Sequence, residues 1–187
     1  AQELSPHLAY HSLAHTKDDV LPAAARLGRF AGLEKEDYLL LETAALYHDT
    51  GFLVSYHDHE RYSIQIARAT LPDFGYSAEQ IESIAGLIAA TRMPQRPTGL
   101  LQELMCDADL DLLGRDDFMQ LNRNLLQEIS HFNGRTIPEK DWLTAQTSFL
   151  VNHNFFTSTA RMLRNIALMQ AALLSSNGSG YPADLPA

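Results

Sequence analysis

The stretch LLLETAALYHDTGF, residues 39–52, is an apolar run that ends in a histidine and an aspartate side by side. Because the residues before His48 are almost all apolar, we expect a buried helix whose end faces the protein interior. A charged aspartate with little access to water is costly unless it is paired, and a divalent metal is the strongest partner for an Asp–His pair. The alternative is structural: Asp49 accepts hydrogen bonds from the turn at Thr50 and Gly51, and His48 is a satisfied core residue.

Apolar residues at three- and four-residue spacing recur along nearly the whole chain, and alternating strand-like stretches are hard to find. With 187 residues, the chain is predicted to be an all-α, single-domain helical bundle. The predicted helices span 15–31, 36–49, 57–71, 77–91, 99–112, 115–132, 138–153 and 157–176. Ser77 followed by Gln80 predicts a capping box. The small, polar, Pro- and Gly-rich end predicts a domain over 1–176 and a flexible tail over 177–187.

Composition and charge restrict the partners and the compartment. The formal net charge is −9 and no cluster of Lys and Arg interrupts the acidic background, so we expect no binding to a nucleic acid polymer. No apolar stretch approaches the roughly 18 residues of a membrane span, so we expect no membrane partner. A lone Cys106 and the lack of a visible export signal make the cytoplasm the expected location.

Two further groups of polar residues are candidates for the same site as His48 and Asp49. His11 and His15 are four residues apart, which places both imidazoles on one helical face. The alternative is an ordinary pair of surface histidines with the same spacing. In CDADLDLLGRDDF, residues 106–118, three aspartates alternate with small or apolar residues, and i and i+2 positions diverge on a helix. We therefore expect one of them, Asp109, to point inward, although an acidic helix end is commonly solvated.

Taken together, these residues form a mixed imidazole and carboxylate set: His15, His48, Asp49 and Asp109. Such a set suits Mn²⁺, Fe²⁺, Co²⁺, Zn²⁺ or Mg²⁺ and leaves positions open for water and substrate.

Four motifs in this order carry a resemblance: YHSLAHT, YHDTGF, HERYSIQIA and DADLDLLG. They resemble the HD-domain superfamily of metal-dependent phosphohydrolases over roughly residues 8–118, and FLVNHNFFTSTARMLR, at 149–164, is similar to helices that close the core of small bacterial HD proteins. The resemblance implies an all-α bundle with His15, His48, Asp49 and Asp109 as metal ligands.

The resemblance also implies an activity, the hydrolysis of a small phosphoester by a water that the metal activates. Asp49 would ligate the metal and hold this water, and His11 or His59 would protonate the departing alkoxide. His11 occupies a position similar to that of the leaving-group acid of cyclic-nucleotide phosphodiesterases. His59 resembles the histidine that follows the HD pair, and it can instead bind a second metal.

One departure from the family pattern bears on the number of metals. HD proteins with two metals are similar to one another in having a further histidine near the end of the fourth helix. In LIAATRMP, residues 87–94, Thr91 occupies the corresponding position. We therefore expect one firmly bound metal and no fully ligated second one. The departure also argues against a diiron oxygenase on the HD fold, which stays an alternative, as does a non-catalytic ligand-binding module.

The substrate is expected to be small and phosphorylated, with a nucleotide as the leading candidate. Lys17, Arg61 and Arg92 lie near the motifs and are the candidate phosphate-binding residues, although each is equally suited to be a solvated cation. Trp142 and Phe149 recur at near-helical spacing and are interpreted as core residues. A homodimer is compatible with a helical bundle of this size.

Overall fold

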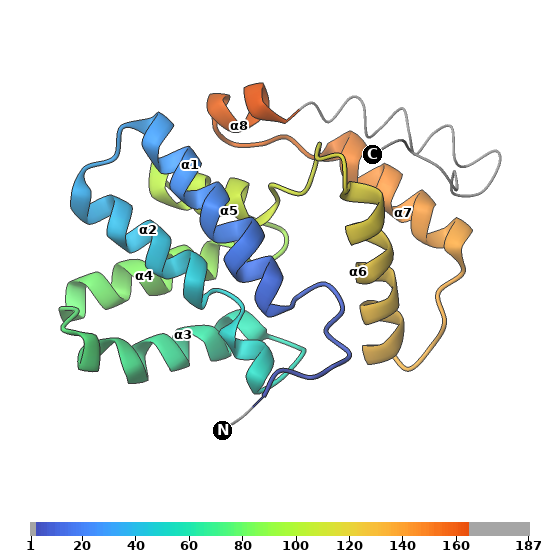
Figure 1. The fold of residues 1–187 in the computed structure, drawn as a ribbon, viewed down its shortest axis with the longest axis horizontal. Helices are drawn as coiled ribbons and strands as arrows, with labels where there is room; N and C mark the ends of the chain where they lie inside the picture. Colours follow the sequence, from blue (N-terminus) through green and yellow to red (C-terminus); the bar gives the residue numbers. More distant parts are fainter. Residues whose placement is uncertain (1–2, 165–187) are drawn as a thin grey trace.

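The computed structural model describes residues 3–164, and every regular element within them is helical (Figure 1). The α-helices are α1 (Leu21–Ala31), α2 (Lys35–Tyr47), α3 (His59–Thr70), α4 (Ala78–Ala90), α5 (Leu100–Asp109), α6 (Phe118–Phe132), α7 (Glu139–Asn152) and α8 (Ser158–Leu163). A π-helical turn at His15–Val20 precedes α1, and 3₁₀ turns lie at Thr50–Leu53 and Leu71–Phe74. The all-α fold predicted from the apolar spacing is confirmed.

The helix ends differ from the prediction in ways that affect the site. The helix predicted over 36–49 ends at Tyr47, so Asp49 follows the helix instead of belonging to it. The capping box predicted at the start of α4 is present, with Ser77 and Gln80 bonded to one another's backbone N–H groups. The tail predicted over 177–187 lies outside the described residues, as does most of the helix predicted over 157–176.

The helices α1 to α5 form one packed bundle. In it α1 contacts α2 and α5, while α4 contacts α2, α3 and α5. Leu41, Ile84 and Leu104 are fully buried among the core residues of this bundle. Figure 1 shows α6 and α7 at the right of the view, beyond the bundle. The segment before α1 also contacts α6, since the ring of His7 stacks on that of His131 at 3.7 Å.

A close contact between α3 and the turn after α2 fixes the position of the His–Asp pair. The Ser63 hydroxyl donates to the carbonyl oxygen of His48 at 2.5 Å and accepts from the N–H of Gly51 at 2.8 Å. A Cβ atom at Gly51 would lie 1.9 Å from the carbonyl oxygen of His59. Glycine at position 51 therefore permits the turn to lie directly against the first residues of α3.

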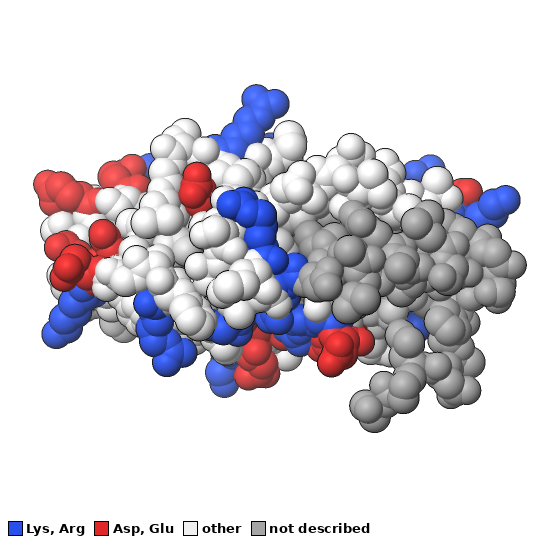
Figure 2. Space-filling view, turned by 90° about the horizontal axis from the view of Figure 1, so that it is seen from above, with Lys and Arg blue, Asp and Glu red and all other residues white. Residues whose placement is uncertain are grey.

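Charged side chains of both signs lie on the surface of the described residues (Figure 2). On the face shown in Figure 2, uncharged residues cover most of the surface and charged side chains of both signs lie between them. Within residues 3–164, none of the helices combines the length and the apolar character needed to cross a membrane.

The contact at Gly51 yields a stability prediction. We expect Gly51→Ala to lower the free energy of unfolding by at least about 2 kcal/mol, because the new methyl group would overlap backbone atoms of α3 that cannot move independently. Urea unfolding followed by circular dichroism measures the difference. The control is Gly86→Ala in α4, where the nearest atom to a new Cβ is the Gln102 side-chain nitrogen at 3.6 Å. This control should leave the stability unchanged or raise it by up to ~1 kcal/mol; equal losses in both variants would contradict the proposed role of Gly51.

Candidate metal centre

His48 lies directly after α2 and is 1% exposed. Its Nδ1 lies 2.8 Å from the carbonyl oxygen of Ala45, a group that can only accept, so Nδ1 carries the proton. In the neutral ring, Nε2 then carries a lone pair. Because Nε2 is buried and has no hydrogen-bond partner within residues 3–164, the ring is prepared to ligate through this atom.

His15 reaches the same place from the π-helical turn before α1. Its side chain is buried, and neither ring nitrogen has a hydrogen-bond partner among the residues that the structure describes. The nearest carboxylate on the Nδ1 side is Asp19, at 3.9 Å, which is beyond hydrogen-bonding distance. Asp19 itself is held by an ion pair with Arg115, so it remains beside the imidazole. Single π-helical turns are frequent at functional sites.

Two carboxylates complete the cluster. Oδ1 of Asp109 lies 3.3 Å from Nε2 of His48 and 3.7 Å from Nε2 of His15. Oδ2 of Asp49 lies at the same two distances from those nitrogens and has no hydrogen-bond partner in the described part of the chain. Ligand atoms of His15, His48 and Asp109 all lie within 4.8 Å of one another, close enough to hold a metal ion. Asp49 borders this group of three and faces both imidazoles.

The electrostatics of the cluster fit a cation. Burial opposes ionisation of Asp49, yet the neighbouring His48 holds the pKa of this carboxyl well below its usual range. Burial likewise raises the pKa of Asp109, but His15 and His48 bring it down to about 2. Burial would lower the pKa of His15, whereas Asp109 and Asp19 raise it to about 9. Without an ion, protons on the imidazoles thus balance the buried carboxylates, and a metal can replace those protons.

The three alternating aspartates are all turned inward, which corrects the expectation that Asp109 alone would be. Asp107 is 1% exposed and accepts hydrogen bonds from the N–H groups of Phe156 and Thr157, each at 2.8 Å. Asp111 is 4% exposed and pairs with Arg26 and Arg164. Asp109 is the one of the three that joins the histidines. Because α5 ends at Asp109, the three side chains leave the helix end in different directions.

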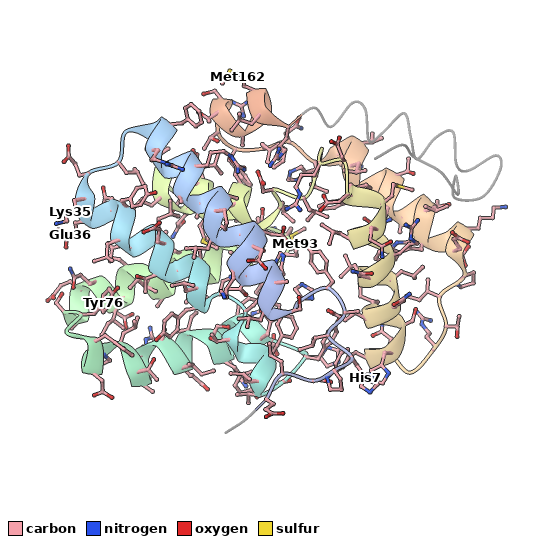
Figure 3. The ribbon with its side chains drawn as sticks, viewed as in Figure 1. His7, Lys35, Glu36, Tyr76, Met93 and Met162 are labelled. Atoms are coloured by element: carbon pink, nitrogen blue, oxygen red, sulfur yellow. The ribbon has the colours of Figure 1, made fainter. Side chains whose placement is uncertain are left out.

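A cavity of about 510 Å³ opens on the cluster. Of the predicted site residues, His11, Asp49, His59, Arg92 and Asp109 line it. Figure 3 labels Met93, another lining residue, in the space between the bundle and α6.

Two of the predicted phosphate-binding residues are not at the cavity. Lys17 is exposed, because it lies two positions after the inward-facing His15 and therefore on another side of the turn. Arg61 is exposed too and places its guanidinium 4.7 Å from the ring centre of its neighbour Tyr62. Arg92 lies at the cavity and forms an ion pair with Asp58, with 2.5 Å between NH2 and Oδ1. Thr91 also lines the cavity, with its hydroxyl donating to the carbonyl oxygen of Ile88 at 2.8 Å.

The rings of the candidate acids His11 and His59 both stack on that of Phe52, and their own centres are 6.1 Å apart. The Phe52 ring is 4.0 Å from that of His59 and 4.6 Å from that of His11. Nε2 of His59 is 3.4 Å from Oδ1 of Asp49, so His59 is beside the cluster. Burial lowers the pKa of His59 below its usual value.

Glu128 is the site residue that sequence reasoning missed. It is fully buried, it accepts from the N–H groups of Tyr10 and His11 at 2.9 and 3.0 Å, and its other oxygen bonds Nδ1 of His11. Burial raises the pKa of Glu128, but the bond to His11 holds it below its usual value. A signal was present in the sequence, since Glu128 continues the stripe of Leu121 and Leu125 at helical spacing, where an apolar residue is expected.

The aromatic residues of α7 are buried, as the sequence predicts, and they also line the cavity. Trp142 belongs to the buried core at 6% exposed, and Phe149 packs against the core. Both face the cavity, and the indole N–H of Trp142 has no hydrogen-bond partner among residues 3–164. The helix α7 therefore contributes a wall of the site.

Comparison with known proteins agrees with this geometry. The family model of the HD domain matches residues 13–111, a segment that contains His15, His48, Asp49 and Asp109. His11 and Glu128 lie outside the matched segment. No curated protein and no solved structure matches the chain.

The protonated imidazoles of the metal-free cluster predict that metal binding releases protons. With a pKa of about 9, His15 is mostly protonated at pH 7, whereas an imidazole must be unprotonated to ligate. Mn²⁺ binding measured by calorimetry at pH 7 should therefore show an enthalpy that depends on the ionisation enthalpy of the buffer. The apparent affinity should rise with pH, by about tenfold per unit for each proton released, until His15 is neutral above pH 9. An enthalpy identical in two buffers would contradict this account of the cluster.

Proposed function

The chain belongs to the HD-domain family, and on that premise we propose that it is a metal-dependent phosphoric ester hydrolase that cleaves a nucleotide or another small phosphoester. The proposal rests on three buried atoms that have no hydrogen-bond partner among the described residues: Nε2 of His15, Nε2 of His48 and Oδ2 of Asp49. The two nitrogens lie within 3.7 Å of this oxygen and also of Oδ1 of Asp109. Buried polar atoms without partners are costly, and a bound cation relieves that cost.

The residues that would hold the ion are His15, His48, Asp49 and Asp109. A divalent ion bound there supplies a Lewis acid for the phosphoryl oxygen and lowers the pKa of a bound water. Asp49 has a second oxygen, Oδ1, directed toward His59 at 3.4 Å. We assign to this oxygen the role of accepting a hydrogen bond from the attacking water and so orienting it.

His11 is the better placed of the two candidate acids. Its Nδ1 is bonded to the buried carboxylate of Glu128, and the backbone N–H of His11 is bonded to the same side chain. This leaves Nε2 as the ring atom available to the cavity, where it can hold a proton for the departing alkoxide. A buried carboxylate behind an imidazole fixes the ring orientation and stabilises the protonated form, as in other histidine–carboxylate pairs.

Arg92 is the cation that we assign to the substrate phosphate. It lies at the cavity with 63% of its side chain exposed and is paired with Asp58, whose side chain is 52% exposed. A phosphate with two or three acceptor oxygens can replace the exposed carboxylate as partner of the guanidinium.

The metal and the hydrolysis are tested together. Purified protein, analysed by elemental mass spectrometry, should contain about one metal ion per chain, and the Mn²⁺-loaded form should hydrolyse bis-p-nitrophenyl phosphate or a member of a nucleotide panel. Asp49→Ala should lose the metal and at least about 100-fold in rate. The control Asp73→Ala removes an exposed carboxylate and should change neither. Two irons per chain and an oxygen-dependent reaction without hydrolysis would instead indicate a diiron oxygenase.

The role of His11 predicts a loss that depends on the leaving group. His11→Gln should slow hydrolysis of phenyl phosphate by ~100-fold or more, because phenolate leaves poorly without a proton. The same variant should change the rate on p-nitrophenyl phosphate little, because p-nitrophenolate leaves unaided. Glu128→Gln should show the same dependence with a smaller loss. An equal loss on both esters in His11→Gln, or the leaving-group dependence in His59→Gln, would assign the acid elsewhere.

A further inference from the structure

The cavity is lined by two chemically different groups of residues. One group comprises Asp49 and Asp109 of the candidate metal centre with His11 and His59, and the other comes from α6, α7 and the segment that joins α5 to α6. This second group contains the polar residues Asn122 and Gln146 but is mainly apolar: Leu112, Leu113, Phe118, Leu125, Ile129 and Phe149. We refer to these six residues, together with Trp142, as the apolar arm. Leu113 and Phe118 are at most 2% exposed, so the arm is a deep wall and not a surface patch.

The charges around the cavity limit the charge of its ligand. Among the described residues that line it, Arg92 is the single Lys or Arg, and it is already paired with Asp58. A divalent ion would offset Asp49 and Asp109, which leaves Glu60 as a further carboxylate of the lining. This count leaves no surplus positive charge, so each further negative charge on a ligand adds repulsion. A single phosphate group, bound by Arg92 in place of Asp58, is the phosphate load that this lining opposes least.

The apolar arm contains an unused donor. The indole N–H of Trp142 is buried and has no hydrogen-bond partner within the described part of the chain. Ligand pockets commonly combine mostly apolar walls with a few polar groups that orient the ligand. This donor therefore suits a ligand whose apolar body fills the arm and carries an acceptor.

The position of His11 relative to the arm identifies which part of the ligand enters it. Leu125 and Ile129, one turn apart on α6, line the cavity, and Glu128 between them binds His11. The acid is thus beside the arm. The group that receives the proton of His11, the departing alcohol, is the group that the arm accepts.

We propose that the substrate is a phosphoester carrying a single phosphate, whose leaving alcohol bears a compact apolar or aromatic group that occupies the apolar arm. This inference rests on the proposed function and narrows it, because it disfavours nucleoside triphosphates and other polyphosphates. Hydrolysis of such an ester breaks the P–O bond to the alcohol and forms a P–O bond to the water oxygen. The alcohol departs with the proton of His11, and the proton that the water loses on attack restores the protonated His11 by way of solvent.

The test measures binding separately from catalysis. Trp142 is the chain's one tryptophan, so its fluorescence reports occupation of the arm. The Zn²⁺-loaded protein is titrated with phenylphosphonate, methylphosphonate and tripolyphosphate, none of which is an ester that the enzyme can cleave in this way, and calorimetry checks each affinity. Phenylphosphonate should bind at least about tenfold more tightly than methylphosphonate, since burial of a phenyl ring is worth at least that factor. Tripolyphosphate should bind less tightly than phenylphosphonate.

A matched pair of variants on α6 locates the preference. Leu125→Gln makes the arm polar and should reduce the preference for the phenyl group to within about threefold. Leu126→Gln alters a neighbouring residue of similar burial that does not line the cavity and should keep the preference. If Leu125→Gln does not fold, as judged by circular dichroism, Ile129→Thr tests the same wall.

The outcomes separate this inference from the proposed function. Equal binding of the two phosphonates, tighter binding of tripolyphosphate, or a phenyl preference that survives in Leu125→Gln would overturn the inference even if phosphoesters are hydrolysed. A phenyl preference without hydrolysis of any phosphoester would overturn the proposed function, and the substrate assignment would fall with it. The preference, its loss in Leu125→Gln and hydrolysis of phenyl phosphate together would support both.

Discussion

The constraint on which the site depends is the burial of two carboxylates beside two imidazoles. Asp49 and Asp109 come from different elements, and each is held ionised, against the effect of burial, by the histidines that face it. The two carboxylates and two imidazoles come from four places in the fold: the turn before α1, the end of α2, the turn that follows it and the end of α5. A bundle in which α1, α2 and α5 contact one another is the arrangement that brings these ends together.

Hydrogen bonds and ion pairs around the cluster fix the positions of the side chains in it. The Ser63 hydroxyl on α3 donates a hydrogen bond to the carbonyl oxygen of His48, and the carbonyl oxygen of Ala45 accepts one from the ring of the same histidine. At the end of α5, Asp107 and Asp111 use their charges to bind other parts of the chain, which anchors the helix end that carries Asp109. Nε2 of His15, Nε2 of His48 and Oδ2 of Asp49 are thus without hydrogen-bond partners within residues 3–164, while neighbouring groups are bonded. Such an arrangement suits a preorganised site for an ion.

How much of this could be predicted from the sequence depends on the range of each interaction. The helices have a local signature in the apolar spacing, which was sufficient to predict the all-α fold. The His48–Asp49 pair also has one, the abrupt polar ending of an apolar run, and both side chains are buried as that ending predicts. The directions of Asp107 and Asp111 depend on Arg26, Arg164 and the start of α8, which are distant in sequence, so spacing alone could not assign them. Glu128 was missed for the same reason, since its partner His11 is 117 residues away. Trp142 has the spacing of a core residue, and only the tertiary structure shows that part of the core is a cavity wall.

The matched HD segment and the remainder of the chain contribute different parts of the candidate site. The segment 13–111 contains the four candidate ligands, which are general to chemistry at a phosphoryl group. The two features that would distinguish one ester from another, the orientation of His11 and the apolar arm, both depend on α6, outside that segment. Because α6 carries Glu128, which binds His11, and also Leu125 and Ile129, the proposed acid and the proposed pocket for the leaving alcohol cannot move independently. If both proposals hold, substrate preference and acid catalysis are coupled through a single helix, and a shift of α6 would alter both at once.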